Sequence, residues 1–178
     1  HESGGFTIIR ENMTYTTASR IAQVWPSRFS VASALAYVRN PEGLADKVYQ
    51  GRMGNTKSGD GYRYRGGGLI QVTGRAGFEK IGGLIGVPLA EHPELIEDAE
   101  ISLKAACAEA SHFLQYADRG ETGFKAFSNG INRGNAGSSL DPIGWVDRLQ
   151  WYRRWAQALE VEDATDDTSE MGDRGALI

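Results

Sequence analysis

Two carboxylates near the start of the chain, Glu2 and Glu11, are the residues whose type and spacing could do chemistry. They lie nine residues apart in the stretch HESGGFTIIREN. Hydrolysis of a glycosidic bond uses one protonated carboxyl, which gives its proton to the leaving oxygen, and one ionised carboxylate, which activates water or attacks the sugar. Apolar neighbours such as Phe6 favour the protonated form, and a polar loop favours the ionised form. On spacing alone, two unrelated surface glutamates remain the simpler interpretation.

Other catalytic chemistries lack the residues that they need. His1-Glu2 begins like a zinc-binding helix, but position 5 is glycine where the second histidine would stand, so we predict no metal. The chain has no Gly-x-Ser-x-Gly elbow, and its glycine-rich stretch lacks the Lys-Ser/Thr of a phosphate-binding loop. Cys107 lies in an apolar helical pattern, which favours a small buried residue over a nucleophile. No cofactor is predicted.

The apolar pattern predicts a mainly α fold that must position these carboxylates. The glycine-rich stretch 51–68 interrupts the helices and is predicted to be a long loop or a small β-hairpin. The run 69–74 fits either a strand or the start of a helix. Caps and periodicity predict helices over 15–24 (cap Thr16 or Thr17), 30–39 (cap Ser30), 41–50 (Pro41 first), 75–86 (closed by Gly86), 92–117 and 141–160 (cap Asp141, then Pro142).

Two of these helices carry clear apolar stripes, which we interpret as core. The stripe of 92–117 is formed by Ile96, Ala99, Leu103, Ala106, Ala110 and Phe113. The stripe of 141–160 is formed by Trp145, Leu149, Tyr152, Trp155 and Ala156.

Four longer stretches resemble a known family of enzymes. HESGGF followed by ENMTY, then RFSVASALAYVRNPEGLADKVYQGRMGN, SGDGYRYRGGGLIQVTGR and GINRGNAG are similar to glycoside hydrolase family 19. Within it, the match is to the phage and bacterial endolysin branch, which is related to plant chitinases. The resemblance runs from His1 to about Leu159. It implies a lysozyme-like, family 19 chitinase-like helical domain, with the glycine-rich loop at the cleft.

The resemblance also implies roles for single residues. Glu2 matches the general acid, and Glu11 matches the general base for water, with the hydroxyl of Thr73 helping to hold that water. Gln71, Asn132 and Tyr64 match substrate-binding residues, Tyr64 as an aromatic side chain that lines the cleft. The alternative for Gln71 and Thr73 is a buried polar pair without a catalytic role.

Two positions depart from the pattern of the branch. Its members usually read Arg-Gly-Arg-Gly before Leu-Ile-Gln, whereas this chain has Arg65 followed by three glycines, so the cation expected at position 67 is missing. The usual Ile-Asn-Gly-Gly reads Ile-Asn-Arg-Gly here, and Arg133 is a candidate replacement for the lost charge. Loss of a cation from the site would lower activity.

The resemblance predicts a catalytic domain over 1–159 and an acidic, flexible tail over 160–178. In the family, the HESGG motif closes a helix that follows other N-terminal helices, so we expect helices upstream of His1. Without them, Glu2 would stand at a frayed end and the activity would be weak.

The charge distribution bears on the partner. The tail from Glu160 on has seven acidic residues and one basic residue, which leaves 18 basic and 16 acidic residues before it. An excess of basic residues over 47–80 would suit an anionic cell-wall polymer. The expected partner is therefore the glycan strand of peptidoglycan. A nucleic acid, stable membrane insertion and a stable oligomer are not expected.

The predicted function is that of an endolysin made in a host cytoplasm and acting on the cell wall or periplasm, or secreted. A chitinase and a non-catalytic glycan-binding protein remain alternatives. The two enzymes differ in the bond that they cut, and a binding protein would hold glycan without turnover.

Overall fold

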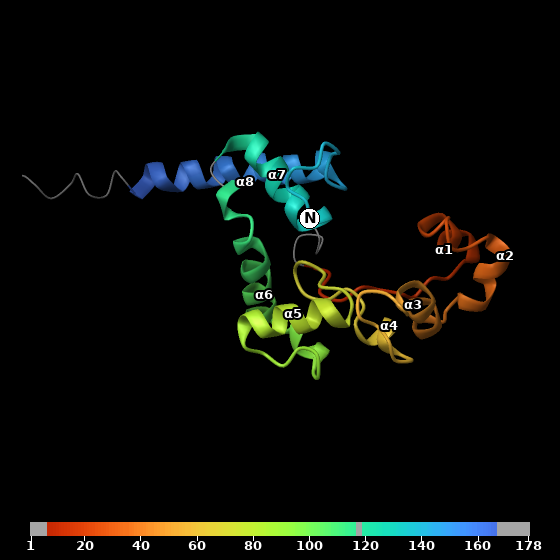
Figure 1. Ribbon diagram of the computed structural model, residues 1–178. Helices are drawn as coiled ribbons and strands as arrows, with labels where there is room; N and C mark the ends of the chain where they lie inside the picture. The colour runs from red at the N-terminus through yellow and green to blue at the C-terminus, as the bar shows by residue number, and fades with distance from the viewer. Residues whose placement is uncertain (1–6, 117–118, 167–178) are drawn as a thin grey trace, which may run out of the picture. The chain divides into compact units, whose positions relative to one another are not determined.

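The structure, a computed structural model, describes residues 7–116 and 119–166, with side chains as far as Leu159 (Figure 1). The chain divides into two compact units at the boundary between His112 and Phe113. We call the described residues 7–112 the N-terminal unit, and 113–116 with 119–166 the C-terminal unit. Both are mainly helical, so the predicted fold class is confirmed.

The first part of the N-terminal unit consists of short helices that begin at the predicted caps. The helix α1 (Ala18–Val24) is capped by Thr17, whose hydroxyl accepts a hydrogen bond from the backbone of Arg20. The capping residue of α2 (Val31–Ala34) is Ser30, and a 3₁₀ turn, η1 (Leu35–Tyr37), follows. The helix α3 (Pro41–Tyr49) begins at proline as predicted. The predicted helix 30–39 is therefore shorter and breaks into two pieces.

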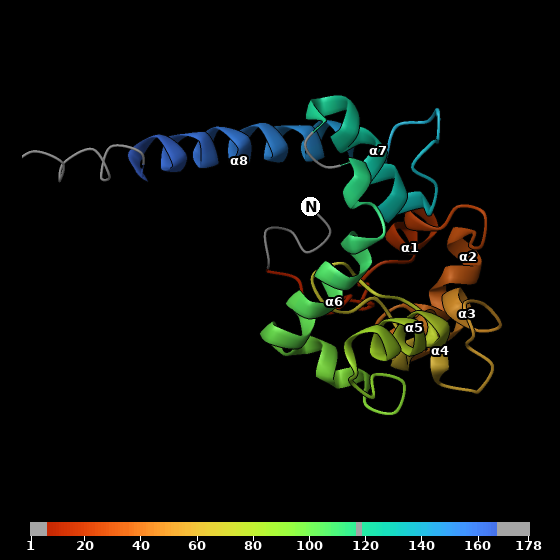
Figure 2. The same cartoon turned by 60° about the vertical axis from the view of Figure 1, so that its left-hand side comes forward.

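Two apolar clusters fill the N-terminal unit. The first cluster lies among α1, α2 and α3 and has as its buried residues Met13, Ala18, Ile21, Phe29, Ala34, Leu44, Ala45 and Val48. The second cluster surrounds α5 (Arg75–Ile85) and has as its buried residues Tyr64, Val72, Phe78, Ile81, Leu89, Ile96 and Ala105. Figures 1 and 2 show α1 beside α2, and α5 beside α6 (Ala99–Ser111).

The glycine-rich stretch between the clusters forms a loop with one helical turn. This turn, α4 (Asp60–Arg63), packs against α3. The buried carboxylate of Asp60 accepts hydrogen bonds from the backbone of Thr56 and Lys57, and an ion pair of 2.6 Å joins it to Arg75. In place of the hairpin, the described residues contain two isolated antiparallel bridges, Arg10 with Gly67 and Gly67 with Val72.

The segment 92–117 is not one helix, so the prediction of a continuous helix is wrong. A 3₁₀ helix, η2 (Pro93–Glu97), precedes Asp98, whose carboxylate accepts hydrogen bonds from the backbone of Glu100 and Ile101 and caps α6. The buried side of α6 contains Ser102 and Ala105, whereas Leu103 is 56% exposed. Cys107 is also exposed, which corrects its interpretation as a buried residue.

The C-terminal unit is built from two long helices and a short turn. The 3₁₀ turn η3 (Leu114–Tyr116) packs against α7 (Gly120–Arg133), a helix that the sequence analysis did not predict. The helix α8 (Trp145–Asp166) begins four residues after the predicted cap, Asp141.

The helix α8 packs against α7 through aromatic rings on one side, and one of its large side chains is exposed. Phe124 of α7 stacks on Tyr152 with 4.5 Å between ring centroids. Trp155, which we predicted to be core, is 55% exposed. The stripe of α8 is therefore only partly buried.

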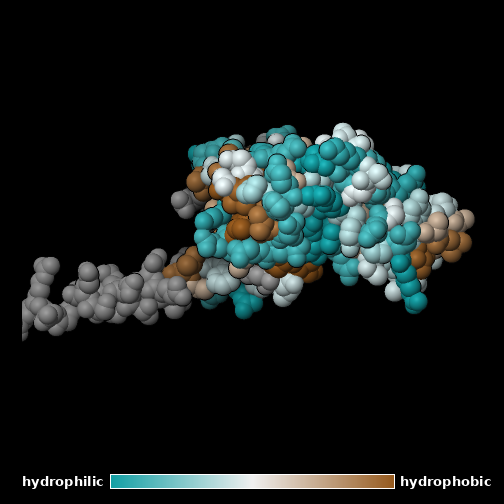
Figure 3. Space-filling view, turned by 90° about the horizontal axis from the view of Figure 1, so that it is seen from below, coloured by the Kyte–Doolittle hydropathy of each residue, from teal (hydrophilic) through white to brown (hydrophobic). Residues whose placement is uncertain are grey.

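The surface of the described residues is largely polar. No described helix combines the length and the apolar character needed to cross a membrane. Apolar side chains gather at the right-hand end of Figure 3, over α1 and α2, where Val31 and Leu35 are 51% and 66% exposed.

Candidate active site

The predicted base, Glu11, lies on a backbone segment that pairs with the end of the glycine-rich loop. The backbone N–H of Glu11 donates to the carbonyl of Gly66 at 2.8 Å, and that of Gly68 donates to the carbonyl of Ile9 at 2.8 Å. Gly67 and Val72 exchange two further backbone hydrogen bonds of 2.8 and 3.0 Å. Two stretches far apart in the sequence, 9–11 and 66–72, are thereby held together around Glu11.

Two hydrogen-bond donors hold the carboxylate of Glu11, one at each oxygen. The phenol of Tyr49 donates to Oε1 at 2.7 Å, and the backbone N–H of Gly66 donates to Oε2 at 3.1 Å. Donors of this kind stabilise an ionised carboxylate, which is the form that a general base needs. Burial and the neighbouring charge of Glu11 raise the pKa of Tyr49 far above its usual value, so the phenol keeps its proton and remains a donor.

Gln71 lies near the side chain of Glu11, and Thr73 is hydrogen-bonded to Gln71. The amide of Gln71 donates to the carbonyls of Gly68 and Ile8, and the hydroxyl of Thr73 donates to the carbonyl of Gln71 at 2.8 Å. A Cβ atom at Gly66 would lie 2.7 Å from Oε1 of Gln71 and 3.3 Å from Cβ of Glu11. Only glycine therefore fits between these two side chains.

The backbone of Gln71 is in an unusual conformation. Its φ is +55°, a left-handed value that costs about 1 kcal/mol for a residue with a side chain. Such strain is common where a structure must hold a functional side chain in a fixed direction.

The other predicted site residues belong to the second apolar cluster, to the C-terminal unit or to the part of the chain outside the described residues. Tyr64 is fully buried, its hydroxyl donates to the carbonyl of Ala90 at 2.6 Å, and its ring meets Phe78 edge-on. Because no part of its ring is exposed, Tyr64 supports the core and does not line an open cleft. Asn132 belongs to the C-terminal unit, where its side-chain oxygen accepts from the backbone of Ile143 at 3.0 Å. Glu2, the predicted acid, lies outside the described residues.

The space beside Gly67 explains the absence of a side chain there. A Cβ atom at this position would lie 2.8 Å from Nη1 of Arg10 and 2.7 Å from Cγ2 of Ile96. The cation next to position 67 is therefore supplied by Arg10, from the paired segment. Arg133, the candidate replacement from the sequence, instead donates two hydrogen bonds to the carbonyl of Asp141 in the C-terminal unit.

Several of the basic residues over 47–80 are also used within the fold. Arg75 pairs with Asp60, Lys80 pairs with Glu109, and Arg65 donates to the carbonyl of Glu11. Fewer free cations therefore remain for a polyanion than the sequence suggests.

Sequence reasoning missed Tyr49 and Arg10. Tyr49 is 38 residues from Glu11, and only the fold brings them together. Arg10 had one available signal, since it directly precedes the predicted base in a chain that lacks the cation expected at position 67.

Groups of metal-binding residues are missing from the part of the chain that the structure describes. It contains no group of three or more His, Cys, Asp or Glu side chains that could hold a metal ion. The chemistry of the cluster around Glu11 is that of a carboxylate and its hydrogen-bond donors.

Comparison with known proteins gives one informative relative. No model of a known protein family matches the chain. A Haemophilus influenzae protein named "Glycosyl hydrolase family 19 domain-containing protein" is 37% identical to it over 109 residues, which are 60% of this chain and 54% of that protein. The chain thus spans about half the length of this curated relative. The similarity supports the resemblance to family 19, and does not distinguish the endolysin branch.

Proposed function

We propose that this protein is an endolysin that hydrolyses the β-1,4 bonds between N-acetylmuramic acid and N-acetylglucosamine in peptidoglycan. The observation that carries the proposal is the carboxylate of Glu11, held by Tyr49 and Gly66 with Gln71 nearby. The relative named for glycosyl hydrolase family 19 supports glycan hydrolysis in general. The finer assignment to peptidoglycan rests on the sequence motifs.

In the proposed mechanism, Glu11 is the general base. It takes a proton from a water molecule that the hydroxyl of Thr73 helps to orient, while Glu2 gives its proton to the leaving oxygen. The sugar is then attacked on the face opposite the leaving group, which inverts the anomeric centre. This geometry needs roughly 6.5–9.5 Å between the two carboxyl groups, enough for the water.

The two donors at Glu11 have a definite function in this mechanism. They fix the orientation of the carboxylate before the substrate binds, which lowers the cost of reaching the transition state. Tyr49 and Gly66 are therefore positioning groups, since they act on the substrate through Glu11.

The proposed setting is lysis of a bacterial cell wall. We propose that the protein acts as a monomer on the glycan strand, after synthesis in a host cytoplasm or after secretion. Neither nucleic acid nor stable insertion into a membrane has a part in the proposed reaction.

The test is a pair of charge-removing variants assayed on two substrates. We expect Glu11→Gln and Glu2→Gln to lower the rate of peptidoglycan hydrolysis by about 10²–10⁴-fold, the usual contribution of a general base or acid. Glu79→Gln is the matched control, because Glu79 is an exposed glutamate on α5 outside the cluster. The rate is measured as loss of turbidity of bacteria stripped of their outer membrane.

The products decide the bond that is cut. N-acetylmuramic acid at the new reducing end would support the proposal, and N-acetylglucosamine there would contradict it. Faster hydrolysis of soluble chitin oligomers than of peptidoglycan would identify a chitinase instead. Full lytic activity of a folded Glu11→Gln variant would exclude Glu11 as the base.

A further inference from the structure

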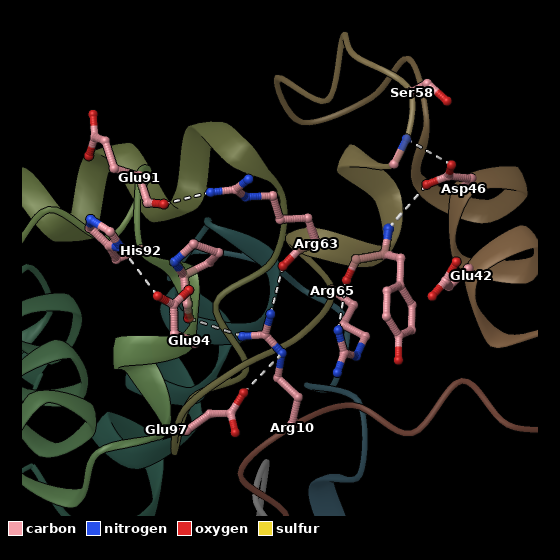
Figure 4. A pocket seen from close by; sticks show the side chains of 13 residues that line it. Arg10, Glu42, Asp46, Ser58, Arg63, Arg65, Glu91, His92, Glu94 and Glu97 are labelled. Atoms are coloured by element: carbon pink, nitrogen blue, oxygen red, sulfur yellow. Dashed lines mark hydrogen bonds and ion pairs between the residues drawn. The ribbon is translucent and has the colours of Figure 1, made fainter.

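A polar cavity lies in the N-terminal unit, and neither the sequence motifs nor the proposed mechanism uses it. We call it the mixed-charge pocket; its volume is about 890 Å³. Figure 4 shows three arginine side chains running through its middle, with acidic residues on either side. Its charged lining consists of Arg10, Arg63 and Arg65, the acidic residues Glu42, Asp46, Glu91, Glu94 and Glu97, and His92.

Backbone carbonyls, which carry no net charge, hold the arginines in place. Arg10 donates to the carbonyls of Pro93 and Arg63, Arg63 donates to that of Glu91, and Arg65 donates to those of Glu11 and Tyr62. The guanidinium groups of Arg63 and Arg65 are thus fixed without an ion pair to the described residues, whereas Arg10 also pairs with Glu97 at 3.6 Å. Among the described residues, Nε and Nη1 of Arg63 and Nη2 of Arg65 have no hydrogen-bond acceptor. These N–H groups can receive a carboxylate.

Two carboxylates of the pocket also lack a counter-ion within the described residues. Glu42 and Glu91 are exposed and form no ion pair there. Asp46, by contrast, accepts hydrogen bonds from the backbone of Gly59 and Tyr62, and Glu94 pairs with His92. The pocket therefore offers fixed positive groups in its middle and free negative groups at its sides, an arrangement that suits a ligand with both charges.

The pocket begins one residue away from the candidate base. Arg10 precedes Glu11 in the chain, and Arg65 donates to the backbone carbonyl of Glu11 at 3.1 Å. The helix α3 also connects the two sites, because positions 42, 46 and 49 lie on one helical face. Glu42 in the pocket and Tyr49 at the base are seven residues apart, which is roughly 10 Å along the helix.

We propose that the mixed-charge pocket binds the peptide stem of peptidoglycan while Glu11 acts on the glycan. The stem carries free carboxylates, which match Arg63 and Arg65, and the amine of its diamino acid, which matches Glu42 or Glu91. A stem of four residues spans about 13 Å when extended, which is sufficient to reach the pocket from a sugar at Glu11. This inference rests on the proposed function, and it names the part of the substrate that distinguishes peptidoglycan from chitin.

Direct binding tests the pocket without any catalysis. The probe is the free tetrapeptide L-Ala-γ-D-Glu-meso-diaminopimelate-D-Ala, titrated into the full chain and followed by calorimetry. We expect saturable binding that weakens as salt increases, since charged groups near the surface are screened. The same peptide with its amine acetylated, or with its carboxylates amidated, should bind more weakly than the parent.

Pocket variants assign the binding to this place. We expect Arg63→Gln to weaken the tetrapeptide about tenfold and Glu42→Gln about threefold, as for a charge-assisted hydrogen bond and an exposed ion pair. Glu79→Gln is the matched control, because it removes the same charge outside the pocket and should leave the affinity unchanged. Circular dichroism of each variant checks that it is folded.

A second measurement compares intact glycan strands with strands whose stems have been removed by an amidase. Wild-type protein should cleave the intact strands faster, and Arg63→Gln should reduce this preference. No binding of the tetrapeptide, or binding that is unaffected by both pocket variants, would overturn the inference even if glycan is cleaved. Binding that depends on the pocket in a protein that cleaves no glycan would leave the pocket assigned and the proposed function refuted.

Discussion

The two apolar clusters of the N-terminal unit are held together in different ways. The first cluster is closed by aromatic rings that meet at their edges, from Tyr15 through Trp25 and Phe29 to Tyr37. The second cluster is closed by a polar network, in which the buried Asp60 pairs with the half-buried Arg75 beside Tyr64. Apolar contacts tolerate small shifts, whereas a buried ion pair fails when one partner is lost.

The candidate base depends on both clusters. Tyr49 packs against the first cluster and donates to one oxygen of Glu11, while Gly66 follows Tyr64 of the second cluster and donates to the other oxygen. The orientation of the Glu11 carboxylate therefore depends on both clusters being folded, although aromatic contacts stabilise one and a polar network stabilises the other. Variants on each side should therefore affect stability and activity in different proportions.

The largest effect on stability is expected from the polar network of the second cluster. Asp60→Asn removes the charge that neutralises Arg75, and we expect a loss of about 3 kcal/mol in the free energy of unfolding. Denaturation by urea measures this loss. Glu100→Gln is the control, because it breaks only an exposed pair within α6 and should cost less than about 0.5 kcal/mol. Similar losses of stability from the two variants would show that the pair of Asp60 and Arg75 contributes no more than an exposed ion pair.

The same pair predicts a dependence on pH. Burial opposes the ionisation of Asp60, but hydrogen bonds from Arg75 and from the backbone of Lys57 outweigh it, so the pKa of this carboxyl is below its usual value. A lowered pKa in the folded state gives stability that is complete above the pKa of the unfolded chain, about 3.9, and is lost as the pH falls through the folded value. The difference in unfolding free energy between wild type and Asp60→Asn should shrink below about pH 4. An unchanged difference at low pH would contradict this.

The contact between Arg10 and the glycine-rich loop gives the next effect. Gly67→Ala places a methyl group against Arg10 and Ile96, so we expect a loss of about 2 kcal/mol together with lower activity. Gly83→Ala is the matched control, because a Cβ atom there meets nothing within 4 Å and alanine favours the helix. Thermal unfolding of both variants measures the contrast. A Gly67→Ala protein as stable as wild type would show that the loop can move to accommodate the methyl group at no cost in stability.

The first cluster should affect activity more than stability. Tyr49→Phe keeps the ring and removes one donor from Glu11, so we expect kcat/KM to fall about tenfold, as for a hydrogen bond to a charged group. Tyr37→Phe is the control, since the hydroxyl of Tyr37 has no hydrogen bond within the described residues. A similar fall in kcat/KM in both variants would argue against a specific role for Tyr49.

The smallest effect is expected at Tyr64. Tyr64→Phe leaves the carbonyl of Ala90 without its donor and should cost about 1 kcal/mol of stability. The pH–rate profile should keep its shape, because Tyr64 has no exposed surface. A rise in KM for glycan with unchanged stability would restore Tyr64 to the substrate site.

The sequence predicted the elements that local signals determine. Thr17, Ser30 and Gly86 cap their helices through contacts within a few residues, and these ends appear as caps in the structure. Continuity is harder to predict, because Asp98 can either continue a helix or cap the next one. Its carboxylate finds two backbone N–H groups of α6, and the cap prevails.

The helix α7 was missed because glycines and asparagines dominate its sequence. Gly123 and Gly130 lower helix propensity, but both lie where a side chain would collide, with Tyr116 and Phe113 respectively. Close packing thus overrides propensity there. The candidate site was predicted in part, since the motifs include Glu11, Gln71 and Thr73. Tyr49 depends on a long-range contact that no local pattern encodes, whereas Arg10 could have been noticed because it directly precedes Glu11.

The position of Glu11 between two cores has a consequence for inactivation by heat. Partial opening of either cluster removes one of its two donors, even while the other cluster remains intact. Activity should therefore disappear at a lower temperature than the helical signal, and cooling should restore it, since only part of the unit has opened. A protein of this design would stop working reversibly before it melts.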